Sequence, residues 1–146
     1  MIKFFKISCL IFLTFSFINT SFSKENFYNE ALKLYKKEKY EDARFLFERN
    51  IVFNPKDANS YLYLAKIDNF EEDQRKEEYN LETTLLIEPD NEEALLMLMK
   101  IALKKSNYQK VKDLSETFIK VCNKLCEEDK KIQESLKNIE PENNES

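Results

Sequence analysis

The chain of 146 residues contains no glycine, no histidine and no tryptophan, and it has only three prolines. Without glycine it has neither a glycine-rich phosphate loop nor a dinucleotide-binding fingerprint, because both need backbone conformations that glycine permits. Without histidine it cannot form a Ser-His-Asp or Cys-His arrangement, a His-ligated zinc site or a c-type haem attachment. Carboxylate or lysine chemistry stays open, so the composition disfavours an enzyme without excluding one.

The residues that are present favour helices. Leu, Lys and Glu are abundant, helix breakers are scarce, and apolar residues make up 42% of the chain. Because these apolar residues recur at helical spacing, the chain can bury a core and disorder is not expected. The length is that of one domain at most. We therefore expect one all-α domain.

The first residues have the pattern of a secretory signal peptide. Lys3 and Lys6 accompany the start of an apolar run over residues 7–18, and small residues follow it. The run covers about 18 Å as a helix, which is short of a hydrocarbon core of roughly 30 Å. The pattern predicts cleavage before Lys24, with residues 1–23 removed and the protein exported. An uncleaved membrane anchor is the alternative.

Removal of the predicted signal peptide makes the chain more acidic. Two of the 23 basic residues leave with it, so 21 remain against 27 acidic residues and the net charge becomes −6. An acidic protein without a basic stripe binds nucleic acid and anionic lipid poorly. Neither is expected as a partner, and contact with a membrane would come only from an uncleaved signal segment.

An internal period of 34 residues runs through the rest of the chain. Pro55 and Pro89 are separated by this distance, and each lies in a turn-like segment before an apolar helical stretch. The other pairs that keep the offset are Phe47 with Leu81, Ile51 with Leu85, Tyr61 with Leu95, and Leu64 with Leu98. A fixed period of this size indicates a repeat architecture.

This pattern resembles the tetratricopeptide repeat, a helix–turn–helix unit of 34 residues. Ala43 and Phe47 match the A-x-x-x-F pair of the family's second helix, and Pro55 matches its closing proline. The resemblance implies an all-α solenoid with repeats at 24–57, 58–91 and 92–125, a capping helix at 127–139 and a disordered tail at 140–146. Helices are expected near 25–37, 41–53, 58–70, 74–87, 92–105, 108–122 and 127–139.

Four positions depart from the family pattern: Met99 replaces the small residue of the third repeat, Asn123 stands in place of its closing proline, and two charged residues lie in the second repeat. Asp68 and Glu77 stand where the repeat usually has an apolar or small residue. Because charged groups are costly to bury, this predicts that the second repeat packs most loosely and that its second helix is free to shift register.

The resemblance also places a binding surface, because the first helix of each repeat lines the concave side in this family. Carried over residue by residue, the candidate partner-binding residues are Tyr28, Leu32, Tyr35, Leu62, Lys66, Asn69, Lys100 and Lys104. This groove would be aromatic and apolar toward the first repeat and basic toward the third. It suits a protein or peptide with apolar anchors and some acidic residues, and no cofactor. For any single residue, inter-repeat packing or simple solvation is the alternative.

Two cysteines remain after the predicted cleavage, Cys122 and Cys126. In an oxidising compartment an even count suggests a disulfide, and on an ideal helix their Cα atoms would lie about 6 Å apart. We expect a structural disulfide where the third repeat turns into the capping helix. A redox-active pair or a soft-metal site is the alternative, although neither histidine nor a nearby methionine supports it.

These features favour a non-catalytic protein-interaction scaffold in the periplasm or cell envelope. One alternative is a helical subunit of an envelope complex that only homo-oligomerises. Another is a hydrolase that uses acidic residues, for which the best material is Glu71–Asp73 and Glu127–Asp129. Both runs lie at predicted helix starts, where carboxylates favour the helix dipole and face water.

Overall fold

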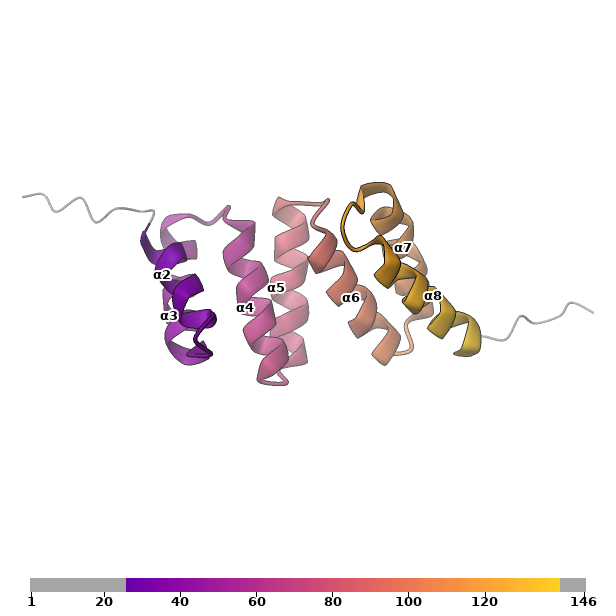
Figure 1. The fold of residues 1–146 in the computed structure, drawn as a ribbon, viewed down its shortest axis with the longest axis horizontal. Helices are drawn as coiled ribbons and strands as arrows, with labels where there is room; N and C mark the ends of the chain where they lie inside the picture. The colour runs from indigo at the N-terminus through magenta and orange to yellow at the C-terminus, as the bar shows by residue number, and fades with distance from the viewer. Residues whose placement is uncertain (1–25, 140–146) are drawn as a thin grey trace, which may run out of the picture.

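The computed structural model of the protein describes residues 26–139, and every regular element in that range is an α-helix. The helices are α2 (Asn26–Tyr35), α3 (Tyr40–Phe53), α4 (Ala58–Phe70), α5 (Gln74–Ile87), α6 (Glu92–Lys104), α7 (Tyr108–Val121) and α8 (Cys126–Ile139). Figure 1 shows them in chain order along the long axis, from α2 at one end to α8 at the other. The predicted all-α solenoid of three helix–turn–helix repeats with a closing helix is confirmed.

The helix boundaries agree with the predicted ones to within two residues. None of the helices in the described range is both long and apolar enough to cross a membrane. The predicted signal peptide and the predicted C-terminal tail lie outside the described residues.

The turn inside each repeat has the same backbone geometry. Glu38, Glu72 and Ser106 follow one another at intervals of 34 residues and have positive φ angles of 59°, 60° and 55°. After the first of them, the Lys39 amide donates to the carbonyl of Leu34 at 3.0 Å, and the other two turns repeat this bond. This pattern normally ends a helix on glycine. A chain without glycine forms it with Glu and Ser, and α2 ends earlier than predicted because the turn begins there.

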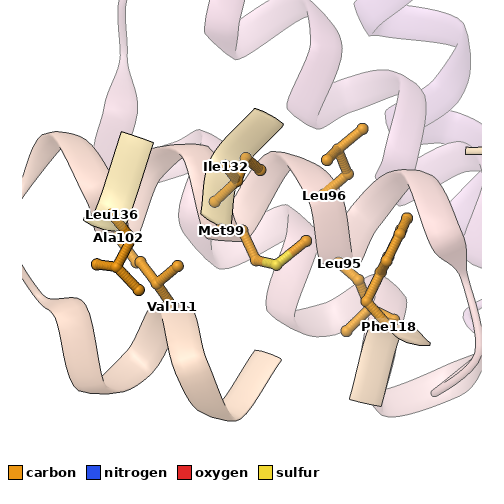
Figure 2. Packing of buried hydrophobic residues seen from close by; sticks show 8 residues of the cluster. All are labelled: Leu95, Leu96, Met99, Ala102, Val111, Phe118, Ile132 and Leu136. Carbon is orange, nitrogen blue, oxygen red and sulfur yellow. The ribbon is translucent and has the colours of Figure 1, made fainter. Parts of the chain in front are cut away.

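The buried core extends through all three repeats as three clusters. Phe47 and Leu81, which are equivalent in the 34-residue period, are both fully buried. At the C-terminal end, the core cluster of α6, α7 and α8 contains Leu95, Leu96, Met99, Ala102, Val111, Phe118, Ile132 and Leu136, as Figure 2 shows. The last two belong to α8, whose other face carries mostly charged residues. That combination is expected of a helix that caps a stack of repeats.

The prediction that the second repeat is loosely packed is wrong. Asp68 is fully buried, but its Oδ1 accepts a hydrogen bond from Arg44 at 2.6 Å and its Oδ2 accepts one from Asn80 at 2.7 Å. Glu77 is also buried and accepts a hydrogen bond from the Asn69 side chain at 2.9 Å. Buried polar groups that are fully hydrogen-bonded specify one packing arrangement. The helix α5 accordingly covers the predicted residues without a register shift.

Candidate functional site

The face formed by the first helices carries an aromatic cluster toward the first repeat. Tyr63 of α4 lies at its centre, with its ring centroid 6.3 Å from Tyr28 and 4.9 Å from Tyr35 of α2. Phe47 of α3 stacks on Tyr63 at 5.2 Å with an interplanar angle of 6°. The predicted residues Tyr28 and Tyr35 are therefore half-buried against a third ring. The sequence reasoning missed Tyr63 because its repeat equivalents were not among the positions carried over.

Burial raises the pKa of two of these tyrosines further above neutral pH. Burial is the main cause that raises the pKa of Tyr28 to about 12, followed by the nearby Tyr63 and Asp57. Burial also raises the pKa of Tyr35 above its ordinary value, with smaller effects from Tyr40, Tyr63 and Glu93. At neutral pH this half of the surface therefore offers ring faces and neutral hydroxyl groups, which suit apolar side chains and peptide backbone.

Two of the predicted site residues make contacts within the protein that stabilise the fold. Leu62 is only 5% exposed and packs in the core cluster with Ala65 and Leu98, so its assignment to the binding surface is wrong. The reason is helix rotation, which turns Leu62 inward and leaves Tyr63 beside it facing the cluster. Lys66 donates to Glu93 at 2.8 Å and lies 4.5 Å from the centroid of Tyr63, so its charge is already paired within the chain. Leu32 is half-buried on α2.

Toward the third repeat, the same face contains a pocket of about 420 Å³. Its walls come from α4, α5 and α6, and the lining residues are Asn69, Glu77, Met97, Lys100, Ile101, Leu103 and Lys104. Three of the predicted residues, Asn69, Lys100 and Lys104, meet here. Burial raises the pKa of Glu77, and its hydrogen bond from Asn69 opposes this effect. Both lysines are exposed, and neither forms an ion pair with another residue in the described range.

Charged residues of both signs continue onto α8. Lys130 and Lys131 are exposed on its first turns, where they pair with Glu127 and Glu128. Lys131 is the main cause that lowers the pKa of Glu128, and Lys100 adds to the effect from α6. We call the combined surface, from the tyrosine cluster through the pocket to α8, the groove face. It is aromatic at one end, and at the other it carries Lys100 and Lys104 among charged residues of both signs.

The acidic runs that suggested a hydrolase have structural roles. Glu71 accepts a hydrogen bond from Arg44 at 2.8 Å, and Asp73 caps α5 by accepting from the Lys76 amide at 3.2 Å. In the second run, Asp129 is buried and accepts a hydrogen bond from the Ser115 hydroxyl at 2.6 Å. Glu71, Asp73 and Asp129 therefore each have a structural role.

The two cysteines lie on the corner between α7 and α8. Their Cα atoms are 5.3 Å apart, and the chain leaves the helix between them, which allows the two side chains to meet. The corner is also held from the third repeat, because the Glu92 carboxylate accepts hydrogen bonds from the amides of Lys124 and Leu125, both at 3.0 Å. This places α8 firmly at the end of the groove face.

No family model and no curated protein matches this chain. Among solved structures, it is similar to the Sgt2 TPR domain from Aspergillus fumigatus, with a TM-score of 0.66 and 13% identity over 84% of this chain and 87% of that one. It is also similar to a chain of the CopN-Scc3 complex, with a TM-score of 0.65 and 14% identity over 80% and 71% of the two chains. At these identities the likeness concerns the fold, and this chain has the tetratricopeptide-repeat fold.

Proposed function

We propose that this protein is a non-catalytic interaction module of the bacterial cell envelope, exported after removal of residues 1–23, which holds a segment of another protein on its groove face. The observation that carries the proposal is the pocket of about 420 Å³, where exposed Lys100 and Lys104 stand beside the apolar Met97, Ile101 and Leu103 and the polar Asn69 and Glu77. Exposed lysines that form no ion pair in the described range, beside apolar side chains of a pocket, are a recognition surface more readily than a stabilising one.

The chemistry of the groove face defines the partner. The pocket wall of Met97, Ile101 and Leu103 suits one apolar side chain, and methionine adapts to different shapes. A carboxylate beside that side chain would pair with Lys100 or Lys104, while the tyrosine cluster would contact a second apolar residue. The partner segment is therefore an acidic peptide with two apolar anchors.

Site-specific cross-linking tests which surface is used. The photoreactive residue benzoylphenylalanine would replace Leu103 in the pocket or Leu86, which is 84% exposed on the outer helix α5. We expect a discrete cross-linked partner from cells with the first variant and none with the second. Equal cross-linking from both positions would contradict the groove assignment.

Charge removal then tests the chemistry with the partner identified in that way. The double variant Lys100→Ala/Lys104→Ala should weaken binding roughly tenfold or more, because each lost pairing with a carboxylate removes a charge-assisted hydrogen bond. The matched control Lys56→Ala/Lys120→Ala removes two exposed lysines elsewhere and should leave the affinity within about twofold. Titration calorimetry measures both, and equal losses in the two variants would refute the proposal.

We also infer that Cys122 and Cys126 form a disulfide in the exported protein. The Cα separation of 5.3 Å and the bend of the chain between them support this pairing. Mass spectrometry of unreduced, alkylated protein from the envelope fraction should show neither thiol modified. Alkylation of both cysteines would exclude the disulfide.

A further inference from the structure

The outer face of the stack, formed by the second helix of each repeat, carries most of the exposed apolar side chains. Eight large apolar side chains are exposed among the described residues, and six of them lie on α3, α5 and α7. These helices lie behind the first helices in Figure 1. The six residues are Phe45, Val52, Phe53, Tyr79, Leu86 and Ile119. Single exposed apolar side chains are normal on a protein surface, so only a shared arrangement is informative.

Four of these side chains follow the repeat. Tyr79 stands 34 residues after Phe45, and Leu86 stands 34 residues after Val52. Within each helix the two side chains are seven residues apart, which places them on the same side about two turns from each other. Phe45 and Tyr79 are 61% and 67% exposed, and Val52 and Leu86 are 75% and 84% exposed. We call these four residues of α3 and α5 the outer patch.

The third repeat shows that the fold does not require apolar residues at these positions. Its equivalent residues are Asp113 and Lys120, and both are exposed on α7. Charged side chains are therefore compatible with the same helix in the same place of a repeat. Burial of the outer patch would stabilise only a contact with another surface.

The first turns of the same two helices carry opposite charges. Glu41 and Asp42 lie in the first turn of α3, and the residues at the same positions of α5 are Arg75 and Lys76. All four are exposed. Lys76 pairs with Asp73 at 2.9 Å, yet 63% of its side chain remains exposed. A surface that is acidic on one helix and basic on the next is complementary to a second copy of itself.

We propose that two copies of this chain form a symmetric dimer through the outer patch, with α3 of each copy against α5 of the other. The helices α3 and α5 run in roughly the same direction (Figure 1), so a two-fold axis parallel to them places equivalent positions opposite each other. The acidic turn of α3 then meets the basic turn of α5. Phe45 contacts Tyr79 of the second copy, and Val52 contacts Leu86 of the second copy.

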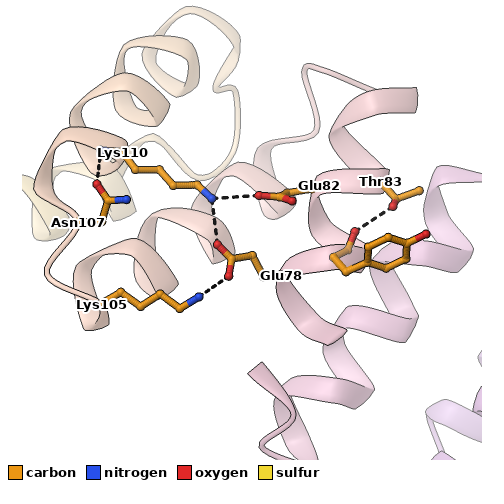
Figure 3. A network of polar contacts seen from close by, with 7 residues as sticks. Glu78, Glu82, Thr83, Lys105, Asn107 and Lys110 are labelled. Atoms are coloured by element: carbon orange, nitrogen blue, oxygen red, sulfur yellow. Dashed lines mark hydrogen bonds and ion pairs between the residues drawn. The ribbon is translucent and has the colours of Figure 1, made fainter. Parts of the chain in front are cut away.

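One pair of equivalent positions opposes this contact. Glu48 of α3 corresponds to Glu82 of α5, and both are exposed. Glu82 already pairs with Lys110 of α7 at 3.0 Å, as Figure 3 shows, so part of its charge is compensated. Like charges across an interface reduce its affinity. We therefore expect a dimer that depends on protein concentration.

The dimer leaves the groove face accessible. The groove face is lined mainly by the first helices and α8, whereas the contact between the copies uses α3 and α5 from the other side of the stack. Two copies would thus carry their groove faces outward. Because the outer patch shares no residue with the groove face, the two proposals stand or fall separately.

Sedimentation equilibrium of the exported protein tests whether the dimer forms. The measured mass should rise from one chain toward two chains as the concentration increases. The mass of one chain at every concentration up to the solubility limit would overturn the proposal.

Apolar variants test whether the outer patch is the contact. Phe45→Ser/Leu86→Ser should raise the dimer dissociation constant roughly tenfold or more, because each contact loses one apolar partner. Both side chains are exposed, so the helices should be retained, which circular dichroism checks. The matched control Phe70→Ser/Ile119→Ser removes two exposed apolar side chains outside the patch and should leave the dimer unchanged. Equal weakening in both variants refutes the assignment.

A charge exchange tests which helices meet. Glu41→Arg/Asp42→Arg opposes like charges at the contact and should weaken the dimer roughly tenfold or more. Addition of Arg75→Glu/Lys76→Glu to the same chain should restore it, since opposite charges face each other again. The control Asp113→Arg/Glu116→Arg makes the same change of charge on α7 and should have no effect. Failure of the second exchange to restore the dimer overturns the pairing of α3 with α5.

Cross-linking separates this contact from the groove face. Benzoylphenylalanine at Leu86 should capture a second copy of this chain and no other protein, and mass spectrometry distinguishes this product from the partner captured at Leu103. A different protein captured at Leu86 would overturn the proposal. The Lys100→Ala/Lys104→Ala variant should form the dimer normally, so loss of groove binding would not affect it.

Discussion

We call the contact surface between two successive repeats a seam. At both seams the side chain that reaches the next repeat comes from the same repeat position, but the two ion pairs differ in burial. At the first seam Arg44 reaches Asp68, which is fully buried, and Asn80 occupies the other carboxylate oxygen. At the second seam Glu78 reaches Lys105 and Lys110, whose side chains remain 45% and 30% exposed. The repeat architecture determines which position contacts the next repeat. The burial of the contact determines how much it contributes to the free energy of unfolding.

The largest expected effect is at the first seam. Arg44→Met should destabilise the protein by about 3–5 kcal/mol, because it leaves the Asp68 carboxylate buried without its cation. Urea unfolding of the oxidised protein, followed by circular dichroism, measures the change.

An apolar replacement of the whole group is the control. Arg44→Met/Asp68→Leu/Asn80→Leu removes all three polar partners, and it should recover most of the loss because no buried charge remains. A loss under 1 kcal/mol for Arg44→Met alone would mean that the two seams do not differ.

The second seam should respond weakly to the loss of its charge. Glu78→Gln is expected to reduce the free energy of unfolding by about 1 kcal/mol or less, since its lysine partners are solvated. The effect should shrink further in high salt because exposed charges are screened. Urea unfolding at low and high salt measures it. A loss as large as that of Arg44→Met would contradict the comparison.

The turns inside the second and third repeats should respond alike to the introduction of glycine. Glu72 and Ser106 end α4 and α6 with positive φ, which costs a side-chain-bearing residue about 1–2 kcal/mol, while glycine loses about 0.5–1 kcal/mol in flexibility. Glu72→Gly and Ser106→Gly should therefore each stabilise the protein by roughly 0.5 kcal/mol. Thermal unfolding measures both. Opposite effects in the two variants would show that the stability of each turn depends on the contacts between the repeats beside it.

The pH dependence of the second seam should be small and have a definite sign. Lys105 and then Lys110 hold the pKa of Glu78 below its ordinary value of 4.5. A lowered pKa in the folded state means that the stabilisation is present above pH 4.5 and is lost as the pH falls through the folded value. The difference in unfolding free energy between the parent and Glu78→Gln should therefore narrow between about pH 5 and about pH 3. A difference that widens on acidification would contradict the pairing.

Most of the fold could be predicted because its signals are local. The prolines, the apolar spacing and the 34-residue period lie within the reach of one or two helices, and they defined all seven described helices. The binding surface was predicted less well. Lys100 and Lys104 do meet at a pocket, but Leu62 is buried and Tyr63 is the ring around which the aromatic cluster forms. Which side of a helix faces outward depends on how neighbouring helices cross. The 34-residue period aligns equivalent positions, but it does not say whether Leu62 or Tyr63 faces the surface.

The sequence by itself determined the helical class, the number of repeats and the exclusion of glycine- and histidine-dependent chemistry. Only the tertiary structure decided which charges became partners. Asp68 looked like a defect in the second repeat until Arg44, 24 residues earlier, was placed over it. The physical reason is that burial and pairing are properties of the stacked helices. A side chain gains its environment from residues that approach it in space, and the spacing along the chain does not specify them.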